Sequence, residues 1–379
     1  MGTGPGARTG EGKPGTTMGT AMGSTMGRAA RAAFLGLGVA ALAVAALTVG
    51  GCEWFEAQPE TNLPPETALV SCAPAAGVLA GGAVTLRWTG SDIDGQVEGY
   101  QWSYDQLGWA DIAADSLVIE AVTVGDHTFR VRAIDNRQEA DPDPAVCTFA
   151  AGELVERAVL IEFLTTNTCR NCPTAEEALD ALRTEYGPGK LAVIAYHDLT
   201  ATDGLATDET VARIDWYTSE PRIPENQWPI AIFDGLRTVE GAVSVEQATS
   251  EYGYEVALRA AVGSPVRLTV TGALGASEGS LEVGAKVTGV LSGRPLVMRF
   301  AVVEDDVRYS GYFAKIFDAV ARDLLEDEAL TLEAIGDSVA VTRTFPVSAG
   351  WTLDNLDVIA FIQDTETREI IQAARLMQD

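Results

Sequence analysis

The chain has 379 residues, 47% of them hydrophobic, so it is long enough for two or three domains with buried cores. Its formal net charge of −28 argues against a nucleic-acid partner, because phosphate binding needs a basic face. With only two histidines and five cysteines available, we expect no metal site and no cofactor.

The first 51 residues are typical of a secretory signal rather than of a folded domain. Residues 1–27 contain almost no core-forming side chains, and two arginines then precede an apolar run over 32–49. The run ends in Gly-Gly before Cys52, which resembles the bacterial lipoprotein box and implies that this thiol is lipidated and anchors the chain to a membrane. Two alternatives stay open: the run is a short membrane-spanning helix, or Cys52 is an ordinary cysteine. Translation from Met26 would give a more compact signal.

Residues 52–66 are expected to form a tether, and residues 67–150 a β domain. Apolar residues at 84, 86 and 88 alternate with polar ones, and turn sequences such as Asp-Ile-Asp-Gly near residue 92 separate the predicted strands. Together with Val-Arg-Ala-Ile-Asp-Asn near residue 133, these sequences resemble the immunoglobulin-like modules of bacterial surface proteins. The resemblance implies a β-sandwich.

Two cysteines lie at opposite ends of this β domain. Cys72 is in its first predicted strand and Cys147 in its last. The terminal strands of a sandwich can be neighbours, and an exported protein folds in an oxidising compartment, so we expect a disulfide between them. The alternative is two separate buried thiols.

Strands and helices alternate over residues 151–263, and this order predicts an α/β unit with at least two parallel strands. In the α/β unit, strands are predicted at 158–163, 191–196 and 230–233, and helices at 173–186, 210–217 and 245–261.

The remainder, residues 264–379, returns to strands and is expected to form a second sandwich-like β domain. Within it, residues 312–325 fit either a helix or a long loop.

A Cys-x-x-Cys pair, Cys169 and Cys172, follows a predicted strand and opens a predicted helix. Zinc would need about four ligands, and the sequence has no second Cys or His pair. A c-type haem attachment would need histidine where the chain has Pro173. Two roles for the pair then stay open: thiol–disulfide exchange, or a structural disulfide. For exchange, backbone N–H groups at the helix start and the Arg170 cation would stabilise a Cys169 thiolate, and Cys172 would resolve the mixed disulfide.

Two further segments resemble thioredoxin-like proteins. Leu-Ile-Glu-Phe over 160–163 resembles their first core strand, and Trp-Pro-Ile-Ala-Ile-Phe-Asp-Gly over 228–235 resembles the segment whose cis-proline faces the cysteines. The resemblance implies a thioredoxin-like fold over 151–263. It also implies that Glu162 is the buried acid that moves protons for the resolving cysteine, and that Pro229 shapes the substrate groove. Pro224 is the rival proline.

His197 ends a predicted central strand, at the edge where α/β units place their ligands. It is a candidate to hold the Cys169 thiolate in an ion pair. The alternative is an ordinary hydrogen-bonded histidine.

A broader resemblance covers most of the chain after the signal. The signal, Phe-Leu-Thr-Thr-Asn-Thr-Cys-Arg-Asn-Cys-Pro, Val-Ile-Ala-Tyr-His and a late Val-Ile-Ala-Phe-Ile-Gln-Asp together resemble the thioredoxin-like outer-membrane lipoproteins of the twenty-eight-kilodalton outer-membrane protein family. Those proteins also carry a β domain after the thioredoxin-like core. The resemblance implies a lipid-anchored protein of the cell envelope, in the outer membrane.

Two functions are compatible with these features. The first is a membrane-anchored thiol–disulfide oxidoreductase that acts on a protein thiol or disulfide, with Cys169 as nucleophile and Cys172 as resolver. The second is a non-catalytic surface-binding or adhesion lipoprotein in which the pair is a static disulfide. The cysteine context favours exchange, and the accessory β domains favour binding.

Overall fold

The computed structural model describes residues 61–75, 77–198, 203–219, 228–291, 293–310, 313–314 and 316–376. The expected signal segment, the lipidation residue Cys52 and the rival Pro224 lie outside these residues. Among the helices that are described, none is long and apolar enough to cross a membrane.

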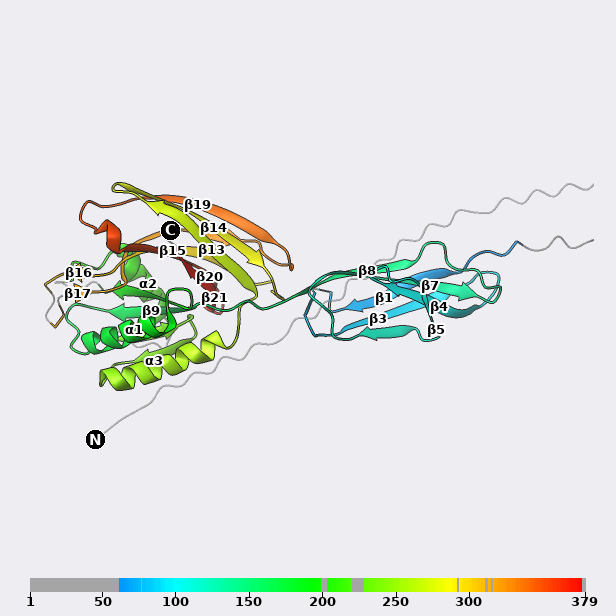
Figure 1. The fold of residues 1–379 in the computed structure, drawn as a ribbon, viewed down its shortest axis with the longest axis horizontal. Helices are drawn as coiled ribbons and strands as arrows, with labels where there is room; N and C mark the ends of the chain where they lie inside the picture. The colour runs from blue at the N-terminus through cyan, green and yellow to red at the C-terminus, as the bar shows by residue number, and fades with distance from the viewer. Residues whose placement is uncertain are drawn as a thin grey trace, which may run out of the picture. The chain divides into compact units, whose positions relative to one another are not determined.

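The first folded part is a β-sandwich, as the sequence predicts (Figure 1). One sheet has the order β1-β3-β6 and the other the order β2-β8-β7-β4-β5. Alternate residues point between the sheets, where Trp88, Leu86 and Phe129 are almost fully buried. The strands are β1 (Glu66–Ala73), β2 (Val78–Leu79), β3 (Val84–Ser91), β4 (Val97–Tyr104), β5 (Ala110–Ile112), β6 (Ser116–Ile119), β7 (Gly125–Asp135) and β8 (Ala145–Gly152).

A disulfide joins the two sheets of this sandwich. Cys72 lies on β1 and Cys147 on β8, with 6.4 Å between their Cα atoms. The predicted pairing is confirmed. The bridge closes a loop with a sequence separation of 75 residues, which restricts the unfolded chain more strongly than a short loop would.

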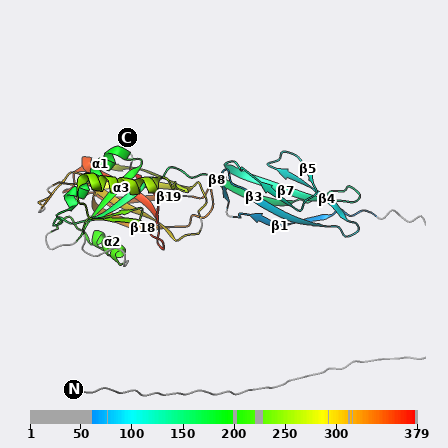
Figure 2. The same ribbon diagram turned by 90° about the horizontal axis from the view of Figure 1, so that it is seen from below.

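The second part begins with an α/β unit in which every predicted strand and helix is present, with ends within two residues of those predicted. β9 and β10 are parallel, β11 runs antiparallel to β9, and β12 antiparallel to β11. Helices α1 and α3 lie on one side of this sheet and α2 on the other (Figure 2). The elements are β9 (Val159–Thr165), α1 (Cys172–Tyr186), β10 (Leu191–His197), α2 (Asp208–Thr218), β11 (Ile230–Phe233), β12 (Arg237–Glu240) and α3 (Val245–Ala260).

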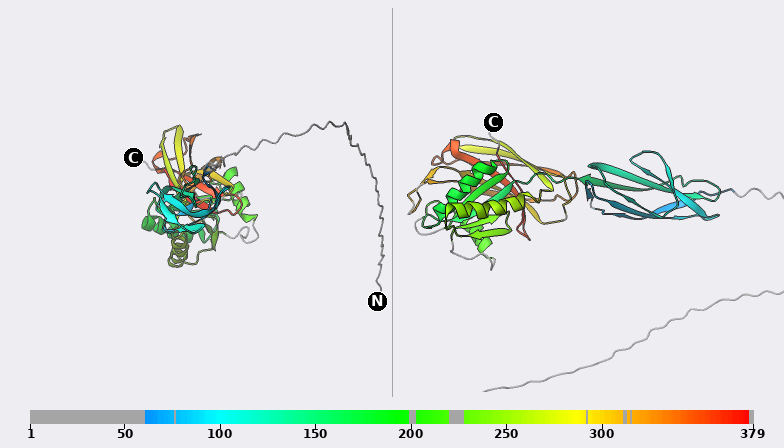
Figure 3. Two further views of the ribbon diagram at one scale, coloured as in Figure 1. Left: turned by 90° about the vertical axis from the view of Figure 1, so that its right-hand side faces the viewer. Right: turned by 60° about the horizontal axis from the view of Figure 1, so that its bottom comes forward.

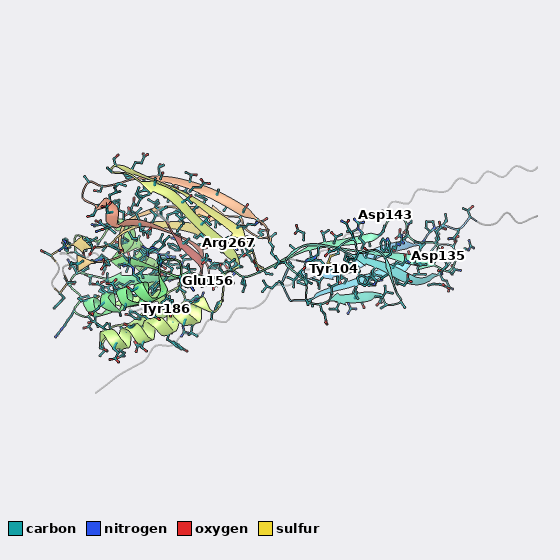
Figure 4. The ribbon with its side chains drawn as sticks, viewed as in Figure 1. Tyr104, Asp135, Asp143, Glu156, Tyr186 and Arg267 are labelled. Atoms are coloured by element: carbon teal, nitrogen blue, oxygen red, sulfur yellow. A yellow bond between two sulfur atoms is a disulfide. The ribbon has the colours of Figure 1, made fainter. Side chains whose placement is uncertain are left out.

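The two faces of β9 are buried in different cores, which explains its mostly apolar sequence, interrupted by the single acid Glu162. Its residues Val159, Ile161 and Phe163 pack beneath α1 and α3. Leu160 and Leu164 face α2 and strands from the end of the chain. At the end of α1, the Tyr186 hydroxyl donates a hydrogen bond to the carbonyl of Gly253 in α3 at 3.5 Å, which connects the two helices (Figure 4).

The sheet continues across the expected domain limit at residue 264. β18 pairs in parallel with β10 at Ala195 and Val320, which gives the order β12-β11-β9-β10-β18-β15-β20-β21. A separate sheet, β13-β14-β19, packs over the later strands around Met298 and Phe300 (Figure 3). The domain limit remains a prediction, but one sheet is shared by both sides of it.

The prediction of a helix or long loop over 312–325 is wrong for most of its described residues. This segment contains β17 and the first half of β18, which lies between β10 and β15. Partner strands on both sides, rather than local propensity, determine its conformation. The elements after α3 are β13 (Val266–Leu274), β14 (Glu278–Val287), β15 (Leu296–Glu304), β16 (Val307–Arg308), β17 (Ile316–Phe317), β18 (Val320–Leu330), β19 (Ser338–Pro346), the 3₁₀ turn Leu353–Asn355, β20 (Leu356–Asp364) and β21 (Ile370–Arg375).

Candidate functional site

The Cys169–Cys172 pair lies at the junction between β9 and α1. It forms a disulfide, with 5.4 Å between the Cα atoms. Cys172 is the first residue of α1 and only 1% exposed, whereas Cys169 precedes the helix and is partly exposed. Of the two sulfurs, Cys169 is therefore the one that an incoming thiol or disulfide can reach.

The start of α1 is arranged to favour negative charge on Cys169. The backbone N–H of Cys172 donates to the Cys169 Sγ at 3.0 Å, and the first turn contains no acidic residue. After reduction of the disulfide, the same N–H would stabilise a thiolate at this sulfur. Arg170 is exposed between the two cysteines.

Pro229 comes directly before β11, the strand beside β9. The Trp228–Pro229 peptide bond is cis, as the resemblance implied. Ile230 pairs with Leu164 in the antiparallel β11–β9 ladder. Pro229, the residue before Ile230, therefore lies beside Thr165, the last residue of β9 before the cysteine loop. The Pro229 carbonyl accepts from the N–H of Gly241 at 2.7 Å, which fixes this end of β11.

His197 ends β10 beside Thr165, on the same edge of the sheet. Its ring is 1% exposed, and Nδ1 lies 2.9 Å from the Asp203 carboxylate. Burial would raise the pKa of Asp203, but the hydrogen bond and charge of His197 outweigh it and lower that pKa. Within the described part of the chain, Nε2 of the ring is buried without a hydrogen-bond partner.

Asp203 connects this histidine to the cysteine loop. Its carboxylate accepts the backbone N–H of Asn167 at 2.7 Å, just before Cys169, and that of Leu205 at 3.0 Å. The contacts of His197 therefore correspond to the hydrogen-bonded alternative: through Asp203, the ring supports the backbone of the loop that carries Cys169.

Glu162 is not brought to the cysteines. It is fully buried and lies on the α2 face of β9, opposite the face that α1 covers. Its carboxylate accepts from Arg213 Nε at 2.8 Å, from Tyr196 Oη at 2.9 Å and from Tyr217 Oη. Burial and this carboxylate raise the pKa of Tyr217 well above its usual range. The proton-transfer role that the resemblance implied for Glu162 is not supported by this geometry.

An acid that the sequence analysis did not select lies on the cysteine side of the sheet. Glu176 is half-buried on α1, four residues after Cys172, beside Phe163 and Ala195. Burial, followed by the charges of Asp180 and Asp318, raises the pKa of Glu176 to about 7. The four-residue spacing from Cys172 within a predicted helix was the only signal in the sequence.

Comparison with known proteins supports the architecture more than the chemistry. No protein-family model matches the chain, and no curated protein does. Among solved structures, HBP35 of Porphyromonas gingivalis has a TM-score of 0.50 at 18% identity, covering 58% of this chain and 75% of that one. This likeness shows a shared fold.

Two other solved structures are similar to smaller parts of the chain. A domain of the outer membrane lipoprotein Omp28 from Porphyromonas gingivalis has a TM-score of 0.20 at 12% identity, covering 31% of this chain and 89% of that one. A fibronectin(III)-like module of Clostridium thermocellum CbhA has a TM-score of 0.19 at 22% identity, covering 23% and 96%.

Proposed function

We propose that this chain is a lipid-anchored protein of the cell envelope whose thioredoxin-like domain exchanges thiols and disulfides through Cys169 and Cys172. Lipidation at Cys52 would supply the anchor and place the protein at the outer membrane. The immunoglobulin-like sandwich and the later β strands would be accessory to this domain. No cofactor is needed, because the electrons move between sulfur atoms.

The single observation that carries the proposal is the difference between the two cysteines. Cys169 is partly exposed and its Sγ accepts an N–H at the start of α1, while Cys172 is buried. An exposed, stabilised sulfur suits the attacking thiolate, and a buried sulfur three residues later suits the resolving one. The strand order β12-β11-β9-β10 and the cis peptide bond before Pro229 support the thioredoxin-like assignment.

An equilibrium titration in glutathione buffers, with free thiols trapped at each point, tests this function. The full chain carrying Cys52→Ser, Cys72→Ser and Cys147→Ser isolates the Cys169–Cys172 pair. We expect a midpoint potential well above about −300 mV and one thiol that reacts rapidly at acidic pH. A pair that stays oxidised in every buffer would instead indicate a static disulfide in a surface-binding lipoprotein.

A further inference from the structure

We propose that Glu176 is the proton acceptor for Cys172 when this cysteine resolves the mixed disulfide on Cys169. The inference rests on the proposed exchange function and assigns a residue to its second step. Glu162 cannot serve this step from the opposite face of β9, so the acid has to come from the α1 side of the sheet.

Glu176 lies about one helical turn after Cys172 on α1. Residues four apart on a helix are neighbours, with about 5–6 Å between their Cβ atoms. Side chains on a helix also lean toward its N-terminus, and for Glu176 this is the direction of the first turn, where Cys172 is buried.

The surroundings of Glu176 shield it from water on its inner side. Together with Phe163 of β9, Val193 and Ala195 of β10 and Ala319 of the β17–β18 turn, it lines a narrow crevice beneath α1. Apolar side chains from three elements and the half-buried Glu176 therefore line the same crevice. A carboxyl group in such surroundings exists in both protonation states near neutral pH, as proton exchange with a thiol requires.

The charged groups around Glu176 come from two sides. On α1 these are Asp180 and Arg183, and Arg183 is bound at 2.6 Å by Asp305 of the β15–β16 turn. The negative charge of Asp318, in the β17–β18 turn, raises the pKa of Glu176, whereas the Thr165 hydroxyl at the end of β9 lowers it. The elements that follow residue 264 thus help to set the protonation of a group at the cysteine site.

In the mixed disulfide between Cys169 and the substrate, the Cys172 thiol gives its proton to the Glu176 carboxylate. The Cys172 thiolate attacks Cys169 Sγ, the bond from Cys169 to the substrate sulfur breaks, and that sulfur leaves with the electron pair and takes a proton from water. The substrate disulfide is reduced by two electrons and the cysteine pair is oxidised; in reverse, Glu176 returns the proton to Cys172.

A reaction that releases two coloured thiolates in sequence separates the two steps. The full chain carrying Cys52→Ser, Cys72→Ser and Cys147→Ser is reduced and mixed with one equivalent of dithiobis-nitrobenzoate. The first nitrothiobenzoate reports attack by Cys169, and the second reports resolution by Cys172. We expect Glu176→Gln to slow the second release at pH 7 by at least about tenfold and to leave the first unchanged. The matched control is Glu177→Gln, which removes an exposed carboxylate from the same helix.

The pH profile distinguishes proton transfer from a structural effect. With Glu176 present, the second release should level off above about pH 7, whereas in Glu176→Gln it should keep rising toward the ordinary thiol pKa of about 8.5. If Glu176→Gln does not fold, Asp318→Asn should shift the midpoint to lower pH by removing a neighbouring negative charge.

Each negative result has its own meaning. An unchanged rate and pH profile in Glu176→Gln, or in Asp318→Asn where the first variant fails to fold, overturns this inference while the first release still supports exchange. A missing first release in the unmodified site overturns the proposed function and this inference with it.

Discussion

Removing the charge of Glu162 should destabilise the protein strongly, because Arg213 would remain buried without a counter-ion. Arg213 is 5% exposed, and its guanidinium bonds to Glu162 at 2.8 Å and to Gln363 Oε1 of β20 at 2.8 Å. Removing one partner of a buried ion pair lowers the free energy of unfolding by about 3–5 kcal/mol. Glu162→Gln keeps the side-chain shape, so we expect a loss of that size from the charge alone. Typical domains are stable by only about 5–15 kcal/mol.

Urea unfolding of the full chain measures this loss, and hydrogen exchange in β9 and β20 locates it. Asp215→Asn, an exposed change on the same helix as Arg213, is the control and should stay within about 0.5 kcal/mol of the unmodified chain. The double variant Glu162→Gln/Arg213→Met should lose less than the sum of the two single variants, since it leaves no unpaired charge. A stable Glu162→Gln chain, or strict additivity, would refute the reasoning.

Three further predictions concern pH and the sandwich disulfide. The pKa of Glu176 is raised to about 7, so the folded state binds a proton that the unfolded state has released; stability should fall as the pH rises from about 4.3 to 7, and melting curves should show Glu176→Gln more stable than the unmodified chain at pH 8. Burial would raise the pKa of Glu369, but hydrogen bonds from Arg294 and Arg259 lower it; its contribution is present above about pH 4.3 and lost below it, and Glu369→Gln should flatten that dependence of the urea midpoint. Replacing Cys72 and Cys147 by serine should cost the sandwich about 4 kcal/mol in denaturant titrations, and an unchanged midpoint would argue against the bridge.

Local sequence patterns were sufficient to predict most elements of the α/β unit. The strand before Cys169 is an apolar run with a single acid, and α1 shows helical spacing from Ala178 through Leu182 to Tyr186. The strand and helix order that supports the thioredoxin-like assignment could therefore be read from the sequence. The cis bond at Pro229 came from resemblance, since no local pattern determines it.

Long-range pairing could not be predicted in the same way. Leu324 and Leu325 occur in a segment that fits helical spacing, yet β18 pairs with β15 on one side and β10 on the other. The parallel contact between Ala195 and Val320 joins residues more than a hundred positions apart, and nothing local in either segment indicates the partner. The continuity of the sheet across residue 264 follows from this pairing.

The residues around the cysteines were missed for a related reason. A sequence shows that residue 162 lies on a strand, but the choice of face depends on which helix covers which side. Strand alternation places Glu162 with Arg213 and places Phe163 beneath α1. Asp203 and Glu176 became candidates only when the strand ends and the helix start were brought together.

The two faces of β9 therefore separate the stability of the fold from the chemistry of the cysteine pair. Glu162→Gln should lower the urea midpoint and leave the second nitrothiobenzoate release unchanged, because its carboxylate lies on the α2 face. Glu176→Gln should slow that release without the large loss of stability, because its carboxyl group lines the crevice beneath α1 and, among the described residues, forms no buried ion pair whose partner would be left unpaired. Measuring both variants in both assays tests the assignment of faces directly. If Glu162→Gln slowed the second release while the chain remained folded, Glu162 would be the proton acceptor that the resemblance implied.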